Sequence, residues 1–91
     1  MDRQSIIKEI TRIVGPTDFG AWRIGLTHEP EERKTHWKDI EKKDVSCWTI
    51  WRGDSLSDAQ AIESYFINVR GMIGGGDGNL SPSRTGYIYI F

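Results

Sequence analysis

The hydrophobic residues of this 91-residue chain change their spacing from segment to segment, and this alternation limits the folds open to it. Between residues 3 and 14 they recur every three or four positions, which is the period of an amphipathic helix. In residues 22–27 they alternate with small or polar residues, as in a half-buried strand. The same alternation of helix and strand periods recurs twice more, which predicts helices packed on a small sheet.

Turn and capping residues set the boundaries of these segments. Gly15-Pro16 ends the first helix, because glycine suits a helix C-terminus and proline cannot continue the helix. Pro30 begins the second helix, whose last turn carries Lys42 and Lys43. Ser57 and Gln60 have the spacing of a capping box for the third helix. The predicted elements alternate helix and strand over residues 3–14, 22–27, 30–43, 45–52, 57–73 and 86–91.

This order predicts an α+β protein with the succession α-β-α-β-α-β. Three strands this short form a small twisted sheet, antiparallel or mixed, that three helices must cover to be stable. A chain of 10.4 kDa is the size of one domain, so residues 1–91 are predicted to fold as a single unit.

Charge and cysteine content exclude several classes of protein. The net charge of −1 is too small for a strongly basic coat that binds nucleic acid or a membrane surface. The single cysteine, Cys47, rules out an internal disulfide and a cysteine-rich zinc site. No apolar run approaches the ~20 residues of a membrane span. The first residues contain no signal-peptide core, so we expect a cytoplasmic location and no membrane partner.

The second predicted helix places an arginine on its apolar stripe. At about 100° per residue, Arg33 projects between Trp37 and Ile40, and His36 lies on one flank. An inward arginine either covers an aromatic ring with its side chain or points into a cleft. On another face, lysines 34, 38 and 42 form a row that either follows a phosphate backbone or is simply a solvated surface.

The third predicted helix places a carboxylate within its apolar arc. Glu63 lies close to the line of Ala59 and Phe66, where a carboxylate should be paired or bind a metal ion. Arg70, seven residues further on, falls on nearly the same line and could be its ion-pair partner. The sequence leaves both interpretations open.

These residues together resemble the GIY-YIG nuclease family. Ile24-Gly25-Leu26-Thr27, followed by Arg33 and His36, is similar to the second half of the family signature and the helix with its essential arginine. Ala61-Ile62-Glu63 is similar to the later helix with its metal-binding glutamate, and Asn79 is a loose match to the family asparagine. The resemblance covers residues 21–79.

The chain departs from the family pattern in two places. Arg23 stands where the family has a tyrosine, and no Gly-Ile-Tyr strand precedes residue 22. The terminal segment 86–91, however, is similar to that missing strand. We therefore interpret the chain as a divergent, circularly permuted relative, which predicts that the terminal strand pairs beside residues 22–27.

The resemblance implies hydrolysis of DNA phosphodiesters assisted by Mg²⁺ or Mn²⁺. By this resemblance Glu63 would hold the metal ion, and Arg33 would neutralise charge on the phosphate. Tyr87 or Tyr89 would act as or orient the base, with His36 nearby. The nucleic-acid contacts in this interpretation are Arg23, Lys34, Lys38 and Asn79.

A non-catalytic binding module is the alternative interpretation. Trp22, Trp48 and Trp51 are too many large rings for so small a core, which predicts an exposed tryptophan-rich face. Such a face would bind protein or nucleic acid. The strand over residues 45–52 carries aromatic or apolar side chains on both sides, so a second copy of the chain could cover one of them.

Overall fold

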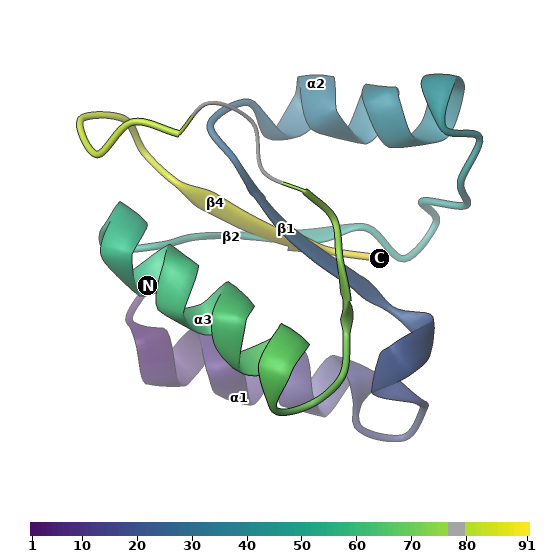
Figure 1. Ribbon diagram of the computed structural model, residues 1–91, viewed down its shortest axis with the longest axis horizontal. Coiled ribbons are helices and arrows are strands. Elements are labelled where there is room, and N and C mark those ends of the chain that lie inside the picture. The colour runs from purple at the N-terminus through teal and green to yellow at the C-terminus, as the bar shows by residue number, and fades with distance from the viewer. Residues whose placement is uncertain (77–79) are drawn as a thin grey trace.

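The structure is a computed structural model that describes residues 1–76 and 80–91. Within these residues, four strands form one mixed sheet in the order β2-β4-β1-β3 (Figure 1). Strand β4 is antiparallel to both β1 and β2, whereas β3 is parallel to β1. The strands β1 to β4 span, in turn, Arg23–Thr27, Thr49–Arg52, Ile73–Gly74 and Tyr87–Ile90. The predicted α+β class is confirmed, but the sheet has four strands and not three.

The helices lie on both sides of this sheet (Figure 1). Helices α1 (Arg3–Val14) and α3 (Leu56–Asn68) pack on one face. On the other face α2 (Pro30–Thr35) continues directly into a π-helical turn, η2 (His36–Ile40). A short 3₁₀ turn, η1 (Phe19–Ala21), precedes β1, and its Phe19 packs on the side of α1 and α3. Within the described residues, no helix combines the length and the apolar character needed to cross a bilayer.

Side-chain caps explain where the two long helices begin. The Asp2 carboxylate accepts a hydrogen bond from the Ser5 backbone N–H at 2.8 Å, and this bond lowers the pKa of Asp2. Ser55 Oγ accepts from the Asp58 N–H at 3.0 Å and caps α3. The predicted cap at Ser57 was therefore wrong by two residues, because Ser55 has the extended backbone that a capping residue requires.

The terminal strand pairs with β1, as the sequence predicted. In the register of this antiparallel pair Thr27 faces Tyr87 and Gly25 faces Tyr89. Because side chains alternate along a strand, Tyr89 lies on the α2 side of the sheet, while Ile88 and Ile90 lie on the side of α1 and α3. The β1–β4 pair therefore contributes to two separate cores.

The predicted third helix was too long. Helix α3 ends at Asn68, and Gly71, which has a φ of +83°, leads the chain back toward the sheet. Ile73, expected on the helix stripe, instead lies in the edge strand β3 and is 41% exposed. Two residues that include a glycine show no alternation, so no local pattern predicts this strand.

The second helix and second strand are also shorter than predicted. The π-helical turn ends at Ile40, which is 69% exposed and does not belong to an apolar stripe. Lys42 follows with a φ of +56°, the left-handed conformation that ends a helix. Residues 45–48 form a turn and its flank, so strand pairing begins only at Thr49.

The first core fills the space between the sheet and helices α1 and α3. Aliphatic side chains from α1 meet those of β1, β4 and α3, and the ring of Phe66 stacks on Phe19 with centroids 6.1 Å apart. Such residues contribute most of the stability of a small domain, at about 2–5 kcal/mol for each large side chain truncated to alanine. The buried members are Ile6, Ile10, Val14, Ile24, Leu26, Trp51, Ala59, Ile62, Phe66, Met72, Ile88 and Ile90.

The second core is smaller and aromatic, and it fixes α2 and η2 to the sheet. Trp37, Val45 and Tyr89 are buried in it. Trp48 stacks on Tyr89 with ring centroids 4.6 Å apart, and the Trp37 indole N–H donates to the Tyr89 hydroxyl at 3.1 Å. Phe91 lies beside the Trp37 ring at 5.2 Å. This core determines which way the helix after β1 faces.

The expected exposed tryptophan face is absent. Trp37 and Trp51 are each only 8% exposed, and Trp22 and Trp48 are half-buried against the first and second core respectively. The prediction was wrong because the sheet has a core on each face, which doubles the room for large rings. The β2 strand is thus packed on both sides by its own chain.

Candidate functional site

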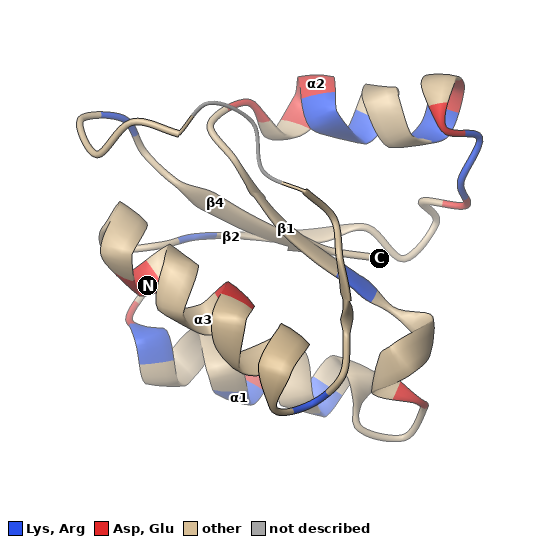
Figure 2. Cartoon of the chain, viewed as in Figure 1, with Lys and Arg blue, Asp and Glu red and all other residues tan. Residues whose placement is uncertain are grey.

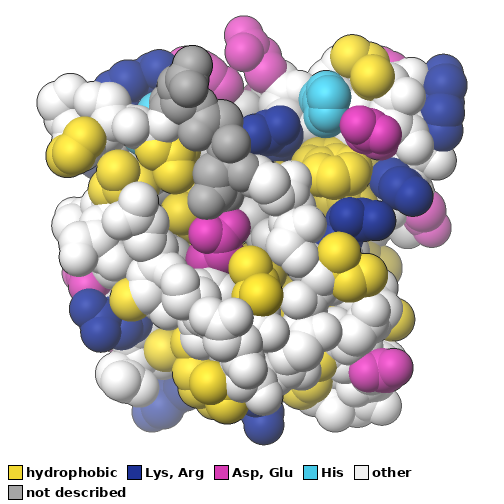
Figure 3. All heavy atoms as spheres, in the orientation of Figure 1, with side chains coloured by type: hydrophobic (Ala, Val, Ile, Leu, Met, Phe, Trp, Pro, Cys, Tyr) yellow, Lys and Arg dark blue, Asp and Glu magenta, His cyan; other side chains and the backbone are white. Residues whose placement is uncertain are grey.

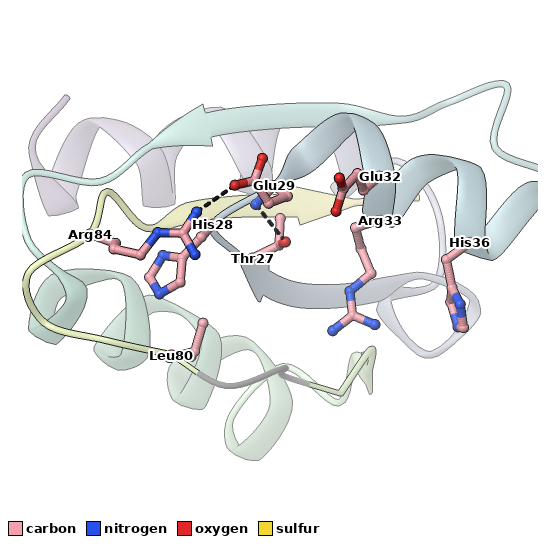
Figure 4. Close-up of a pocket in the computed structure, with 8 residues that line it drawn as sticks. All are labelled: Thr27, His28, Glu29, Glu32, Arg33, His36, Leu80 and Arg84. Carbon is pink, nitrogen blue, oxygen red and sulfur yellow. Dashed lines mark hydrogen bonds and ion pairs between the residues drawn. The ribbon is translucent and has the colours of Figure 1, made fainter.

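A hollow of about 290 Å³ opens where β1 ends and α2 begins (Figure 4). One wall is α2 with the start of η2, and the opposite wall is the segment that leads into β4. Cationic or titratable side chains form most of the lining. The lining residues are Thr27, His28, Glu29, Glu32, Arg33, His36, Leu80 and Arg84.

Arg33 is the cation that α2 directs into this hollow. Its side chain is half-buried and projects from α2 on the same side as that of His36 (Figure 4). Within the described part of the chain, no ion pair engages the Arg33 guanidinium. Of the two interpretations from the sequence, the structure favours an arginine that points into a cleft.

Arg23, and not Arg33, is the arginine that lies over a tryptophan. Its guanidinium carbon is 5.1 Å from the centroid of the Trp37 ring, within the range of a cation–π contact. The side chain is half-buried on the α2 side of the sheet, which leaves part of it open to solvent.

The opposite wall is held by His28, whose two ring nitrogens bond the same segment. The Ser81 N–H donates to His28 Nε2 at 2.8 Å, so this nitrogen carries no proton. Nδ1 lies 2.7 Å from the Thr85 carbonyl oxygen, which can only accept, so Nδ1 carries the proton. His28 is therefore a neutral imidazole that ties residues 81–85 to the end of β1.

Hydrogen bonds and an ion pair complete the rim next to His28. The Glu29 N–H donates to Thr27 Oγ1 at 3.0 Å, and the Glu29 carboxylate is paired with the Arg84 guanidinium (Figure 4). Because Glu29 is already neutralised by Arg84, Glu32 is the remaining acid among the described lining residues.

His36 lies at the other end of the hollow. Its Nε2 is 3.6 Å from a carboxylate oxygen of Glu41, and its ring meets the edge of Trp37 with centroids 5.8 Å apart. Both ring nitrogens of His28 form hydrogen bonds. Within residues 1–76 and 80–91, the longer contact with Glu41 is the one polar interaction found for the His36 ring. In Figure 3, a histidine and basic side chains border a hydrophobic patch on the α2 side.

The two tyrosines of β4 have different environments. Tyr87 is half-buried and faces Thr27, a lining residue, across the β1–β4 pair. Tyr89 is fully buried, and its hydroxyl accepts from Trp37 and lies 3.4 Å from the Gly75 carbonyl oxygen. Neither tyrosine lines the hollow, but Tyr87 is the cross-strand partner of a residue that does.

The remaining predicted residues lie elsewhere. Glu63 is half-buried on α3, which packs against β1, and it is not among the lining residues of the hollow. Lys34 and Lys38 line a second hollow on another side of the helical segment. Arg70, the alternative partner of Glu63, has its guanidinium carbon 4.6 Å from the centroid of the Phe19 ring. Asn79 lies outside the described residues.

Within the part of the chain that the structure describes, the side chains that could bind the metal ion implied by the resemblance are few. Across residues 1–76 and 80–91, no three His, Cys, Asp or Glu side chains group into a metal site. Mg²⁺, however, keeps several waters and commonly takes one or two carboxylates together with substrate phosphates. One carboxylate can therefore be enough as the protein ligand of such a site, and the resemblance assigns that carboxylate to Glu63.

Comparisons of this chain with protein-family models, curated proteins and solved structures give no match. The site is therefore interpreted from its own geometry.

Sequence reasoning singled out Arg33 and His36 as functional residues of the hollow and did not find the other charged or titratable ones, His28, Glu29, Glu32 and Arg84. His28 directly follows Thr27, so its position at the end of a strand was a usable signal. Arg84 gave none, because only the pairing of β4 with β1 brings the segment before β4 to the start of α2.

Proposed function

We propose that this protein binds nucleic acid and hydrolyses its phosphodiester bonds with the help of Mg²⁺ or Mn²⁺. The main support is Arg33, a half-buried guanidinium that points into the hollow and forms no ion pair with the described residues. A planar guanidinium binds two phosphate oxygens at once and stabilises charge that builds up on them. Arg33 lies on α2, the helix that follows β1, and β1 pairs with β4. This order also agrees with the resemblance seen in the sequence.

In this proposal each side chain has a separate task. Arg33 binds the phosphate, and the His36 imidazole takes the proton from the attacking water as its oxygen bonds to phosphorus. Tyr87 orients that water from β4. We assign Tyr89 no chemical step, because its buried hydroxyl is occupied in the second core.

Glu63 does not line the hollow, so its role rests on the resemblance alone: it would hold the metal ion, with water and phosphate oxygens as the other ligands. A divalent ion supplies charge stabilisation for the oxygen that leaves as the P–O bond breaks. Removing the ion or the Glu63 carboxylate should therefore slow hydrolysis without weakening the hold of Arg33 on a phosphate.

Plasmid cleavage by the full chain tests the proposal. Wild type is incubated with Mg²⁺ or Mn²⁺ and compared with Arg33→Ala and Glu63→Gln. We expect each change to lower the cleavage rate by about 100-fold or more, the size of effect seen when one transition-state stabiliser is lost. Arg12→Ala, which removes an arginine of α1, is the matched control and should leave the rate unchanged.

Three outcomes separate the alternatives. Equal cleavage by wild type and Glu63→Gln would show that the activity does not belong to this site. Binding of DNA without cleavage by the wild type would favour the non-catalytic module. Far-ultraviolet circular dichroism of each variant shows whether a lost rate is due to a lost fold.

A further inference from the structure

A second hollow, of about 420 Å³, lies beside the same helical segment. Lys34 and Lys38 reach it from α2 and η2, and Lys43 reaches it from the connection that follows. Figure 2 shows the basic positions along this helical stretch and its connection. Asp44, Val45 and Ser46 complete the lining.

The lysines of this hollow outnumber its acids. Within the described part of the chain, none of the three ammonium groups forms an ion pair. Asp44 is the one carboxylate in the lining, and its bond from the Ser46 N–H lowers its pKa and keeps it ionised. The hollow therefore carries an excess of positive charge, although the whole chain has a net charge of −1.

This arrangement does not help the fold. Lys34 of α2 and Lys38 of η2 are four residues apart on one helical stretch, where like charges repel each other. By itself, this spacing of two lysines does not stabilise the helix. Three lysines around a concave surface instead suit a ligand with several negative charges.

We infer that the Lys34–Lys38–Lys43 hollow binds backbone phosphates of a nucleic acid whose scissile phosphate lies at Arg33. This inference rests on the proposed function and specifies its substrate as an extended polynucleotide. The two hollows flank one helix, whose diameter is about 10–12 Å. At 3.4 Å per nucleotide along a strand, that width corresponds to about three nucleotides. A dinucleotide would therefore reach one hollow only.

The salt dependence of binding tests this inference. Fluorescence anisotropy measures the affinity of the full chain for a 12-nucleotide single strand and a 12-base-pair duplex from 50 to 200 mM KCl, without divalent metal. Each phosphate contact contributes about 0.9 to the slope of log K against log salt for duplex, and about 0.7 for a single strand. Lys34→Gln/Lys38→Gln should reduce the slope by about 1.8 on duplex or about 1.4 on a single strand.

Lys8→Gln/Arg12→Gln is the matched control, because it removes two positive charges from α1 on the opposite face of the sheet. We expect this control to leave the slope unchanged, and Lys43→Gln alone to reduce it by about half as much as the lysine pair. Equal losses in the test and control pairs, or no loss in either, would overturn the inference and make the lysines an ordinary solvated surface.

A dinucleotide substrate separates this inference from the proposed function. If both hold, the lysine variants cleave a thymidine dinucleotide as fast as wild type, whereas Arg33→Ala does not. If wild type shows no cleavage at all, and the salt slope still depends on the lysines, then the proposed hydrolysis is wrong and the proposed binding of backbone phosphates stands. If the lysine variants lose dinucleotide cleavage as well, the second hollow is not a separate phosphate site.

Discussion

At the scale of single residues, Gly25 shows why a motif glycine is required here. A Cβ atom built at this position would lie 2.3 Å from the Tyr89 hydroxyl oxygen, which passes directly over β1. Gly75 meets the same hydroxyl, where an added Cβ would be 2.6 Å away. The two glycines thus make room for the ring at the centre of the second core, so their role is in packing and not in phosphate binding.

Gly25→Ala should therefore destabilise the protein. Overpacking of this kind costs about 1–3 kcal/mol, because a buried ring with hydrogen bonds from Trp37 cannot move aside. Urea unfolding measures the change in free energy. Tyr89→Leu removes the hydroxyl and the ring atoms Cζ and Cε2 that the added Cβ would meet, so the double variant should lose less stability than the sum of the two single changes. Additive losses would mean that the two residues do not collide.

At the scale of elements, His28 connects the end of β1 to the segment before β4. Two hydrogen bonds to one neutral imidazole hold residues 81–85, and the Glu29–Arg84 pair lies beside them. The wall of the hollow therefore depends on a residue that is not itself placed to take part in hydrolysis.

His28→Ala should loosen this wall while the sheet remains folded. A hydrogen bond of this kind is worth about 0.5–1.5 kcal/mol, so losing the bond to His28 should make the Ser81 amide exchange with solvent about 2- to 13-fold faster. Hydrogen–deuterium exchange followed by NMR measures this rate. His36→Ala is the control, since His36 lines the same hollow without bonding Ser81. Unchanged exchange in His28→Ala would show that other contacts hold the segment.

The sequence predicts an element well when residues close together in the chain determine it, and poorly when distant contacts do. Helix α1 followed from the spacing of residues such as Ile6 and Ile10, and the β1–β4 pairing followed from similarity between the terminal segment and a missing strand. The π-helical turn at residues 36–40 has no such signal, and its Trp37 bonds Tyr89, which is 52 residues away in the sequence.

The candidate site could be predicted only in part, because some of its residues are positioned by local helical spacing and others by distant contacts. Helical spacing indicated that Arg33 faces inward, and this is where the structure directs it. The burial of Tyr89 could not be predicted, because alternation alone does not say that both faces of β4 are covered. His28 and Arg84 meet only after the chain has folded, so no local pattern joins them.

At the scale of the whole molecule, the two cores share one sheet. Strand β4 places Ile88 and Ile90 in the first core and Tyr89 in the second, so neither core can separate while this strand is paired on both sides. We therefore expect residues 1–91 to unfold in one cooperative transition, as most small domains do.

A variant with fluorescence from one core only tests this expectation. Trp22→Phe/Trp51→Phe leaves Trp37 and Trp48, which both belong to the second core, as the only tryptophans. Urea unfolding of this variant is followed by tryptophan fluorescence and by far-ultraviolet circular dichroism, which reports mainly on the helices. Because the shared strand couples the cores, both signals should have the same midpoint and slope. A fluorescence midpoint at lower urea would mean that the aromatic core, and with it the wall that presents Arg33, opens while α1 and α3 remain folded.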